Sequence, residues 1–481
     1  MGARDYDGVL ALQGIADVVG VPVAQLNFFV GCAISLFVAV FYRKWLTVPS
    51  VPSTTRHIFN LITGILIAGF VVGCGVFLFT FGFLFLCHIY LMLYPFKVPA
   101  LDITYCLMVS TQKLTTLGFN LGDWYRYGNT QEKMTPEQRA MAVRKFPSVL
   151  EFGSYMLGFQ TVVMGPFCFY NDYISFVDGS HYSQQLSAAG AGSNANYKLD
   201  AKRVPSPNKA VLWKVAQCLL WTGVHLTLPS LLPVERNTDP SFIQEHGTVF
   251  LILHCVASLF CYRARYYFGW TIADAVNNAS GFGFAAFDEN GEAKWDMLTN
   301  CYVQNIEFAT SFKAYIDNWN LSSIRWLRFI CYSRAPLNPT IMTFVLSALW
   351  HGFWPGYYVM FLSGALFTFA ARKWRRIVRP HFQTSQVKRF SYDIATWIAT
   401  QMTIAYVTVP FVVLKAQPII TFYNNWYWSL HIIAVGILLL LPSGRSAKPV
   451  SQPKAEANTA NAAINSTYND IATNHAKSKD L

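Results

Sequence analysis

The segment "SALWHGFWPGYY", Ser347–Tyr358, places a histidine inside an otherwise hydrophobic part of the sequence. Ionisable side chains within a bilayer are costly, by about 2.5–3.5 kcal/mol or more when charged, so those that occur commonly serve a function. Gly352 and Pro355 interrupt the predicted helix just after His351. Broken helices at membrane depth usually line cavities, so we expect His351 to face one.

The composition predicts a protein that crosses the membrane several times. Of its 481 residues, 53% are hydrophobic and only 13% are charged, which is about half the charge typical of soluble domains. Apolar runs of about 20 residues can cross a bilayer, and we expect about eight to eleven such segments. The candidates are Phe28–Phe41, Ile58–Leu93 as two passes, Val149–Phe169, Val211–Leu232, Thr248–Tyr262, Thr340–Ala371, Tyr392–Leu414 and Trp428–Leu441. We therefore predict an all-α polytopic membrane protein.

Residues 1–442 form one predicted membrane domain with polar loops. The stretch Gly179–Lys209 is rich in Ser, Ala, Gly and Asn and predicts a flexible loop. Thr135 to Gln138, "TPEQ", predicts the start of a short surface helix. Residues 443–481 are rich in Ala, Asn and Lys, so we expect a disordered cytosolic tail.

The charge distribution indicates membrane orientation rather than nucleic-acid binding. The formal net charge is +12, and five basic residues lie within Arg372–Arg379 at the end of an apolar segment. Such clusters normally mark cytosolic ends, and this one could also attract a polyanionic coenzyme A thioester. Lys477 and Lys479 resemble a dilysine retrieval signal for the endoplasmic reticulum, although a solvated Lys-rich tail explains them equally well.

The sequence offers no metal site around His351. The ten cysteines lie mostly in apolar runs without a C-x-x-C pair, which indicates small buried hydrophobes rather than zinc ligands or disulfides. The residues around His351 include no second strong ligand. We therefore expect neither a metal nor another cofactor.

Asn320 and His351 form the pair that could perform chemistry. They are separated by Pro336 and Pro339, which leaves room for Asn320 on one helix, a turn, and His351 well inside the next helix. A desolvated imidazole stays neutral and can accept a proton, while an amide can steady developing charge. The sequence contains no G-x-S-x-G nucleophile motif, which favours direct transfer between two bound substrates.

A second interpretation is that His351 is a core histidine bonded to a neighbouring carbonyl. We expect that role for His88, His225, His254 and His431, which also lie in apolar segments. Asn320-Leu321-Ser322 is in addition an N-glycosylation sequon, and a glycan there would exclude Asn320 from a catalytic chamber.

The two motifs resemble the signature of the membrane-bound O-acyltransferase family. Trp319-Asn320 with Trp326, and Trp350-His351-Gly352 followed by "PGYY", carry the resemblance. The segments "CYSRAPLNPTIMTFVLSALWHGFWPGYY", "FTFAARKWRRIVRPHF", "YDIATWIATQMTIAYVTVPFVVL" and "VVMGPFCFYNDYISFVDG" are similar to its lysophospholipid acyltransferase branch. The similarity extends from about Gln25 to Pro442.

The resemblance implies a helical bundle around a chamber that opens to the membrane and the cytosol. It implies His351 as the catalytic base and Asn320 as its partner. We expect substrate-binding roles for Trp319, Trp350 and Tyr357 beside them. The expected reaction moves a fatty acyl group from acyl-CoA, a co-substrate, to a lysophospholipid hydroxyl. We expect monounsaturated donors such as oleoyl-CoA, acceptors with ethanolamine, serine or choline head groups, and residence in the endoplasmic reticulum membrane among its lipids.

Two other functions compete with this interpretation. A protein or sterol O-acyltransferase of the same family is one, although Tyr315–Asn320 is "YIDNWN" and lacks the sterol-branch pattern F-Y-x-D-W-W-N. A non-enzymatic lipid transporter is the other, but the paired broken segments common in transporters are not evident. An H-x-x-x-x-D match at His475 and Asp480 lies in the polar tail and is a chance occurrence.

Overall fold

The structure, a computed structural model, describes residues 9–46, 51–72, 104–127, 134–184, 205–288 and 291–442. Its earlier part contains α1 (Gln13–Val19), α2 (Val23–Trp45), α3 (Ser53–Val72), α6 (Thr104–Tyr127), α7 (Pro136–Met141), α8 (Val149–Leu157), α9 (Tyr170–Asp178) and α11 (Asn208–Leu231). Its later part contains η4 (Val234–Thr238), α12 (Pro240–Glu245), α13 (Thr248–Ser280), β1 (Ala286–Phe287), β2 (Ala293–Lys294), α14 (Val303–Glu307), α15 (Phe312–Ile316), α16 (Leu321–Ile330), η5 (Tyr332–Arg334), α17 (Pro339–His351), α18 (Pro355–Val378), η6 (Arg379–Phe382), α19 (Gln386–Val413), α20 (Ala416–Asn425) and α21 (Ser429–Leu440).

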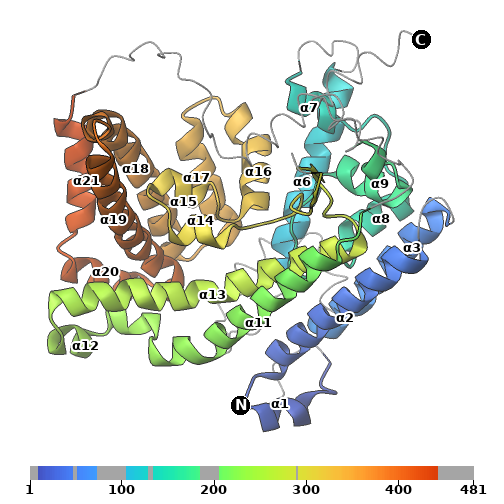
Figure 1. The fold of residues 1–481 in the computed structure, drawn as a ribbon, viewed down its shortest axis with the longest axis horizontal. Coiled ribbons are helices and arrows are strands. Elements are labelled where there is room, and N and C mark those ends of the chain that lie inside the picture. Colours follow the sequence, from blue (N-terminus) through green and yellow to red (C-terminus); the bar gives the residue numbers. More distant parts are fainter. Residues whose placement is uncertain are drawn as a thin grey trace.

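The predicted all-α class is confirmed. Within the described ranges, strands occur only in the short antiparallel pair β1–β2. Helix α13 has 33 residues, a length of about 50 Å, and it packs along α11 across the molecule (Figure 1). It also contacts α2 on one side and α19 on the other, so α13 joins the early helices to the late ones.

Two hydrophobic clusters pack against α13, one on its second half and one on its first half. The first joins α2, α3, α8 and α9 around the fully buried Tyr155 and Tyr173. The second joins α18 to α21 and the middle of α13 around Tyr267, Tyr406 and Tyr423, which are also fully buried. The segments that carry Asn320 and His351 lie beside this second cluster (Figure 1).

Four helical segments of the described chain are long and apolar enough to cross a membrane. They are Gln25–Trp45, Asn208–Thr238, Thr248–Ser280 and Gln386–Val413, and Ser429–Leu440 is a shorter apolar helix. They match five of the predicted apolar segments. The protein is therefore a multi-pass membrane protein, as the composition predicts.

The predicted segment Val149–Phe169 is wrong as a single membrane-spanning helix. Helix α8 ends after nine residues, and the chain turns before α9 begins. The buried Lys113 ammonium donates to the Tyr155 carbonyl (2.7 Å) and to Thr161 Oγ1 (2.6 Å). The last carbonyl groups of a helix have no N–H partner within the helix, and the Lys113 ammonium supplies a donor for them at the end of α8.

His351 lies at a helix end, so the prediction that it lies well inside a helix is wrong. The helix break predicted from Gly352 and Pro355 is confirmed, because α17 ends at His351 and α18 begins at Pro355. Gly352 has φ 122°, a conformation that favours glycine. The same glycine that breaks the helix therefore places the histidine at its end.

The short helix predicted at "TPEQ" is confirmed as α7. Thr135 Oγ1 accepts from the Gln138 N–H (3.2 Å), and Gln138 Oε1 accepts from the Thr135 N–H (2.9 Å). The tail 443–481, the second half of Ile58–Leu93 and most of the loop Gly179–Lys209 lie outside the described residues.

Candidate active site

His351 is partly buried among aromatic rings from three helices. Its ring centroid lies 4.8 Å from Trp350, 5.0 Å from Phe411, 5.2 Å from Phe361 and 5.5 Å from Tyr357. These residues belong to α17, α18 and α19. The imidazole therefore lies in largely apolar, aromatic surroundings.

Trp350 ties this part of the site to α6 and α16. Its ring lies 5.2 Å from that of the buried Trp326, and its Nε1 donates to the Met108 carbonyl (3.2 Å). Trp326 Nε1 in turn donates to Thr115 Oγ1 (2.9 Å). Of the predicted substrate-binding aromatics, Trp350 and Tyr357 are thus brought together around His351.

Asn320 lies immediately before α16, not on a helix as the sequence suggested. Its φ of 51° and ψ of 55° are left-handed, a conformation that asparagine tolerates better than most residues. Asn320 Oδ1 accepts from Asn300 Nδ2 (3.3 Å). This partly buried and bonded side chain is a poor acceptor for a glycan.

Trp319 packs in a separate aromatic cluster against α13. Its ring lies 4.9 Å from Trp270, 5.6 Å from Tyr266 and 6.0 Å from both Tyr267 and Tyr315. The two predicted motifs therefore occupy neighbouring elements, with the Trp326–Trp350 contact joining α16 to α17.

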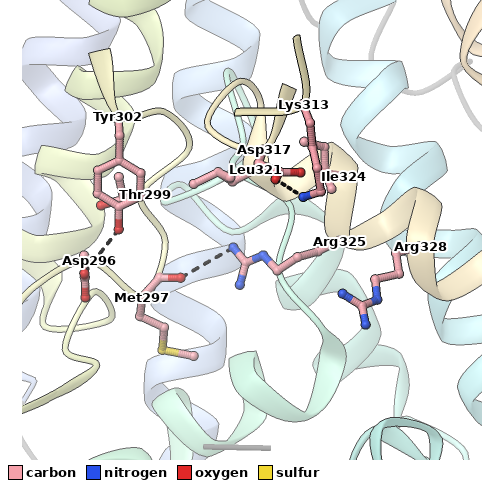
Figure 2. Close-up of a pocket in the computed structure, with 10 residues that line it drawn as sticks. All are labelled: Asp296, Met297, Thr299, Tyr302, Lys313, Asp317, Leu321, Ile324, Arg325 and Arg328. Carbon is pink, nitrogen blue, oxygen red and sulfur yellow. Dashed lines mark hydrogen bonds and ion pairs between the residues drawn. The ribbon is translucent and has the colours of Figure 1, made fainter. Parts of the chain in front are cut away.

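A pocket of about 300 Å³ adjoins Asn320 (Figure 2). It is lined by Asp296, Met297, Thr299, Tyr302, Lys313, Asp317, Leu321, Ile324, Arg325 and Arg328. Arg325 and Arg328 project from the same side of α16 (Figure 2). Lys313 is paired with Asp317, whereas no ion pair within the described ranges involves either arginine. The pocket thus presents two guanidinium groups beside the residue that follows Asn320.

The Glu137 carboxylate lies outside the pocket but interacts electrostatically with these arginines. Burial raises the pKa of Glu137 on α7, while the charges of Arg328, Arg334 and Arg325 oppose that rise. The arginines of α16 and η5 therefore act electrostatically on α7 as well as on the pocket.

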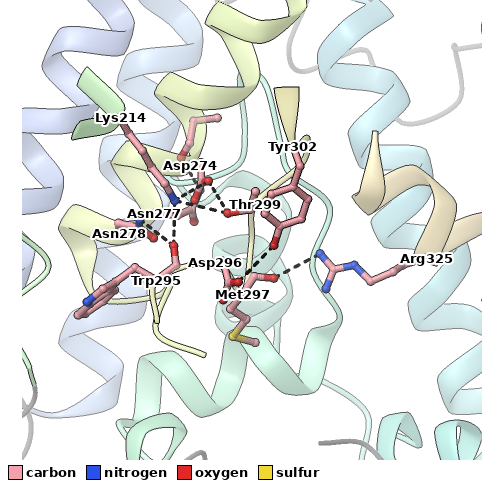
Figure 3. A network of polar contacts seen from close by, with 11 residues as sticks. Lys214, Asp274, Asn277, Asn278, Trp295, Asp296, Met297, Thr299, Tyr302 and Arg325 are labelled. Carbon is pink, nitrogen blue, oxygen red and sulfur yellow. Dashed lines mark hydrogen bonds and ion pairs between the residues drawn. The ribbon is translucent and has the colours of Figure 1, made fainter. Parts of the chain in front are cut away.

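Sequence reasoning missed a buried polar network that supports the segment before Asn320. Lys214 Nζ lies 2.6 Å from Asp274 Oδ2 and donates to the Trp295 carbonyl (2.8 Å), and Thr299 donates to the same Asp274 oxygen (2.6 Å) (Figure 3). Charged residues within apolar segments were the available signal, since Lys214 and Asp274 both lie on membrane-length helices.

The described residues contain no group of three or more His, Cys, Asp or Glu side chains able to hold a metal ion. Their cysteines are free thiols, most of them buried, as the sequence predicts. The candidate site thus combines an imidazole among aromatic rings, an amide held by a second amide, and two arginines at a nearby pocket.

Comparison with known proteins identifies the family. The model of the membrane-bound O-acyltransferase family matches residues 99–413. The chain is 40% identical to the rat membrane-bound glycerophospholipid O-acyltransferase 2, over 93% of this chain and 90% of the relative. It is 36% identical to the human membrane-bound glycerophospholipid O-acyltransferase 1, over 93% and 95%, and 37% identical to the Drosophila melanogaster lysophospholipid acyltransferase 6, over 91% and 64%. The chain belongs to the membrane-bound O-acyltransferase family.

Proposed function

We propose that this enzyme is a lysophospholipid acyltransferase that moves a fatty acyl group from acyl-CoA to a lysophospholipid hydroxyl. The relatives named as glycerophospholipid and lysophospholipid acyltransferases support this substrate class. The observation that carries the proposal is the placement of His351 at the α17–α18 break among four aromatic rings. A neutral base in apolar surroundings suits two lipid substrates.

In the proposed mechanism, His351 is the general base. It accepts the proton of the lysophospholipid hydroxyl as the hydroxyl oxygen bonds to the thioester carbonyl carbon. The carbon–sulfur bond then breaks, and the coenzyme A thiolate takes the proton from the imidazolium. The Asn320 amide donates to the carbonyl oxygen as negative charge develops on it. No covalent acyl-enzyme is required, and Trp319, Trp350 and Tyr357 contribute apolar surface for the substrates.

The pocket beside Asn320 is the proposed entry for the acyl donor. Guanidinium groups bind phosphates through paired hydrogen bonds, and Arg325 and Arg328 offer two of them at the pocket wall. Coenzyme A carries phosphates at one end and its thioester at the other. The phosphates would therefore lie near the arginines, with the thioester directed toward Asn320 and His351.

The proposed function is tested with purified protein and radiolabelled oleoyl-CoA. Acceptors are lysophosphatidylethanolamine, lysophosphatidylserine and lysophosphatidylcholine, with cholesterol and an acceptor peptide to test the two other acyltransferase classes. We expect labelled diacyl phospholipid, and the relative rates with the three acceptors give the head-group preference. Labelled sterol or peptide without labelled phospholipid would show a sterol or protein acyltransferase. Lipid transport across vesicles without acyl transfer would show a transporter.

We further propose the endoplasmic reticulum membrane as the site of this activity. The support is the pair Lys477 and Lys479 near the end of the tail. Truncation after Ser446 should leave microsomal acyl transfer intact while moving a fluorescently tagged enzyme out of the endoplasmic reticulum. A stable truncated protein that keeps its location would argue against a retrieval signal.

A further inference from the structure

Asn300 makes three hydrogen bonds to the start of α16. Its carbonyl accepts from the Leu321 N–H (2.8 Å), and its Oδ1 accepts from the Ser322 N–H (2.8 Å). Its Nδ2 donates to Asn320 Oδ1 (3.3 Å). Asn300 is only 3% exposed, so these bonds are shielded from water.

Asn300 takes over the capping that Asn320 would ordinarily perform. The first N–H groups of a helix lack partners within the helix, and an asparagine at the preceding position usually accepts from one of them. Asn320 makes no such side-chain bond, whereas Asn300 satisfies the N–H groups of Leu321 and Ser322. The Asn320 side chain therefore does not need to cap α16.

The same bonds fix which way both amides face. A backbone N–H can only donate, so Asn300 must turn its Oδ1 toward Ser322 and its Nδ2 toward Asn320. An amide NH₂ can only donate as well, so Asn320 must present its Oδ1 to Asn300. The NH₂ of Asn320 consequently faces away from Asn300, and no acceptor within the described ranges is hydrogen-bonded to it.

Asn300 is itself held in place from two helices. The preceding residue, Thr299, donates to Asp274 Oδ2 (2.6 Å), which is paired with Lys214. Lys214 also holds the Trp295 carbonyl (Figure 3). The connection that carries Asn300 is thus fastened to α11 and α13, which gives the amide pair a rigid support.

We propose that Asn300 is a positioning residue that caps α16 in place of Asn320 and reserves the Asn320 NH₂ for the carbonyl oxygen of the acyl donor. This inference rests on the proposed function, in which the Asn320 amide assists acyl transfer. The three bonds fix the orientation of both amides, and they do so where the Asn320 backbone is left-handed.

The decisive variant is Asn300→Asp. Its carboxylate keeps the acceptor for the Ser322 N–H but cannot donate to Asn320, so the Asn320 amide turns and directs its NH₂ to the carboxylate. We expect kcat at neutral pH to fall by about 10- to 100-fold, reaching at most the lower end of the loss caused by removal of one oxyanion donor, while KM for oleoyl-CoA changes little. Protonation of the new carboxyl restores a donor, so the kcat ratio of variant to wild type should rise as pH falls.

Asn305→Asp is the matched control. Asn305 Nδ2 donates to Asn318 Oδ1 (3.0 Å), so the change breaks a similar amide pair that does not contact Asn320. Its kcat and pH profile should follow those of the wild type. A wild-type kcat and pH profile for Asn300→Asp would overturn the positioning role, as would a loss that does not change with pH.

Hydrogen exchange gives a readout that does not depend on activity. In Asn300→Ala, the Ser322 N–H loses its side-chain acceptor, so the peptide that contains it should exchange faster than in the wild type, while α13 peptides keep their protection. Unchanged exchange would show that Asn300 does not cap α16. If the wild type transfers no acyl group to lysophospholipids, the proposed function fails, and the exchange measurement still decides whether Asn300 caps the helix.

Discussion

His351 and His431 both lie on apolar helices, but their surroundings differ. His431 Nε2 is bonded to Ser363 Oγ (2.9 Å) and its Nδ1 to Tyr406 OH (2.7 Å). Both ring nitrogens are therefore engaged within the core. His351 lies at a helix end, with aromatic rings around it. The sequence could not separate the two, because the distinction depends on partners from other helices.

Two other histidines predicted to be structural each engage one ring nitrogen within the bundle. His254 Nδ1 is bonded to Asn237 Oδ1 (3.1 Å), and His225 Nε2 lies 3.3 Å from Gln25 Nε2. The predicted carbonyl partner is thus found for His254, as an amide oxygen, whereas His225 contacts an amide nitrogen and His431 two hydroxyls. His88 lies outside the described residues.

Replacement of His351 by Ala should remove the general base. We expect kcat for transfer from oleoyl-CoA to a lysophospholipid to fall by about 10²–10⁴-fold, the usual contribution of such a base. The protein should remain folded, because the His351 ring lies at a helix end and is only partly buried. Turnover per mole of monodisperse protein, measured with the thermal midpoint, checks both expectations.

His431→Ala is the control for that experiment. It leaves Ser363 and Tyr406 without their buried partner, which destabilises a protein by roughly 1–3 kcal/mol. We expect a lower thermal midpoint with nearly normal turnover per folded molecule. If His351→Ala instead lowered the midpoint and retained turnover, His351 would be a structural residue and the catalytic assignment would be wrong.

At the level of the helices, the start of α18 is pressed against the end of α19. The Gly356 N–H donates to the Leu414 carbonyl (2.9 Å), and a Cβ at Gly356 would lie 2.1 Å from the Pro410 carbonyl oxygen. Phe411, the next residue, contacts the His351 ring. Gly356 therefore permits the close contact between α18 and α19 that holds the Phe411 ring against His351.

Gly356→Ala should displace α19 and the Phe411 ring with it. Overpacking of this kind costs about 1–3 kcal/mol, and we expect reduced turnover together with a lower thermal midpoint. Gly436→Ala on α21 is the matched control, since nothing lies within 4 Å of the Cβ it would add, and alanine favours a helix. Equal activity of the two variants would show that the α18–α19 contact does not shape the site.

The helices also show where sequence patterns succeed and fail. Gly352 and Pro355 predicted the break after His351, because glycine and proline act on the backbone locally. The end of α8 was not predictable in the same way, since Lys113 closes it from a different helix. The motif around Asn320 predicts a candidate site residue, but its partner Asn300 is known only from a contact between two chain segments. Local chemistry is readable from sequence, whereas partners across the fold are not.

Across the whole molecule, ion pairs join segments that are distant in sequence. Lys214 pairs with Asp274, Arg263 with Glu307 and Arg334 with Asp123, and every side chain in these pairs is less than one-fifth exposed. Such pairs turn charged groups of an apolar chain inward and away from lipid. They connect α11 to α13, α13 to α14, and α6 to η5.

Contacts at the end of α18 predict the membrane orientation. Lys373 Nζ donates to the Leu438 carbonyl (2.7 Å), so the basic cluster Arg372–Arg379 and the end of α21 lie on the same side. Basic clusters beside membrane segments normally face the cytosol. The tail that follows α21 should then begin on the cytosolic side, as a dilysine retrieval signal requires.

Cysteine labelling in sealed microsomes tests this orientation. A membrane-impermeant maleimide should label Arg376→Cys without permeabilisation, because Arg376 is exposed in the basic cluster. Tyr427→Cys should be labelled only after permeabilisation, because Tyr427 is 83% exposed at the opposite end of α21. The described native cysteines are buried or partly buried, which keeps the background low. The reverse pattern would place the Arg372–Arg379 cluster and the start of the tail in the lumen, and Lys477 and Lys479 could not then act as a cytosolic retrieval signal.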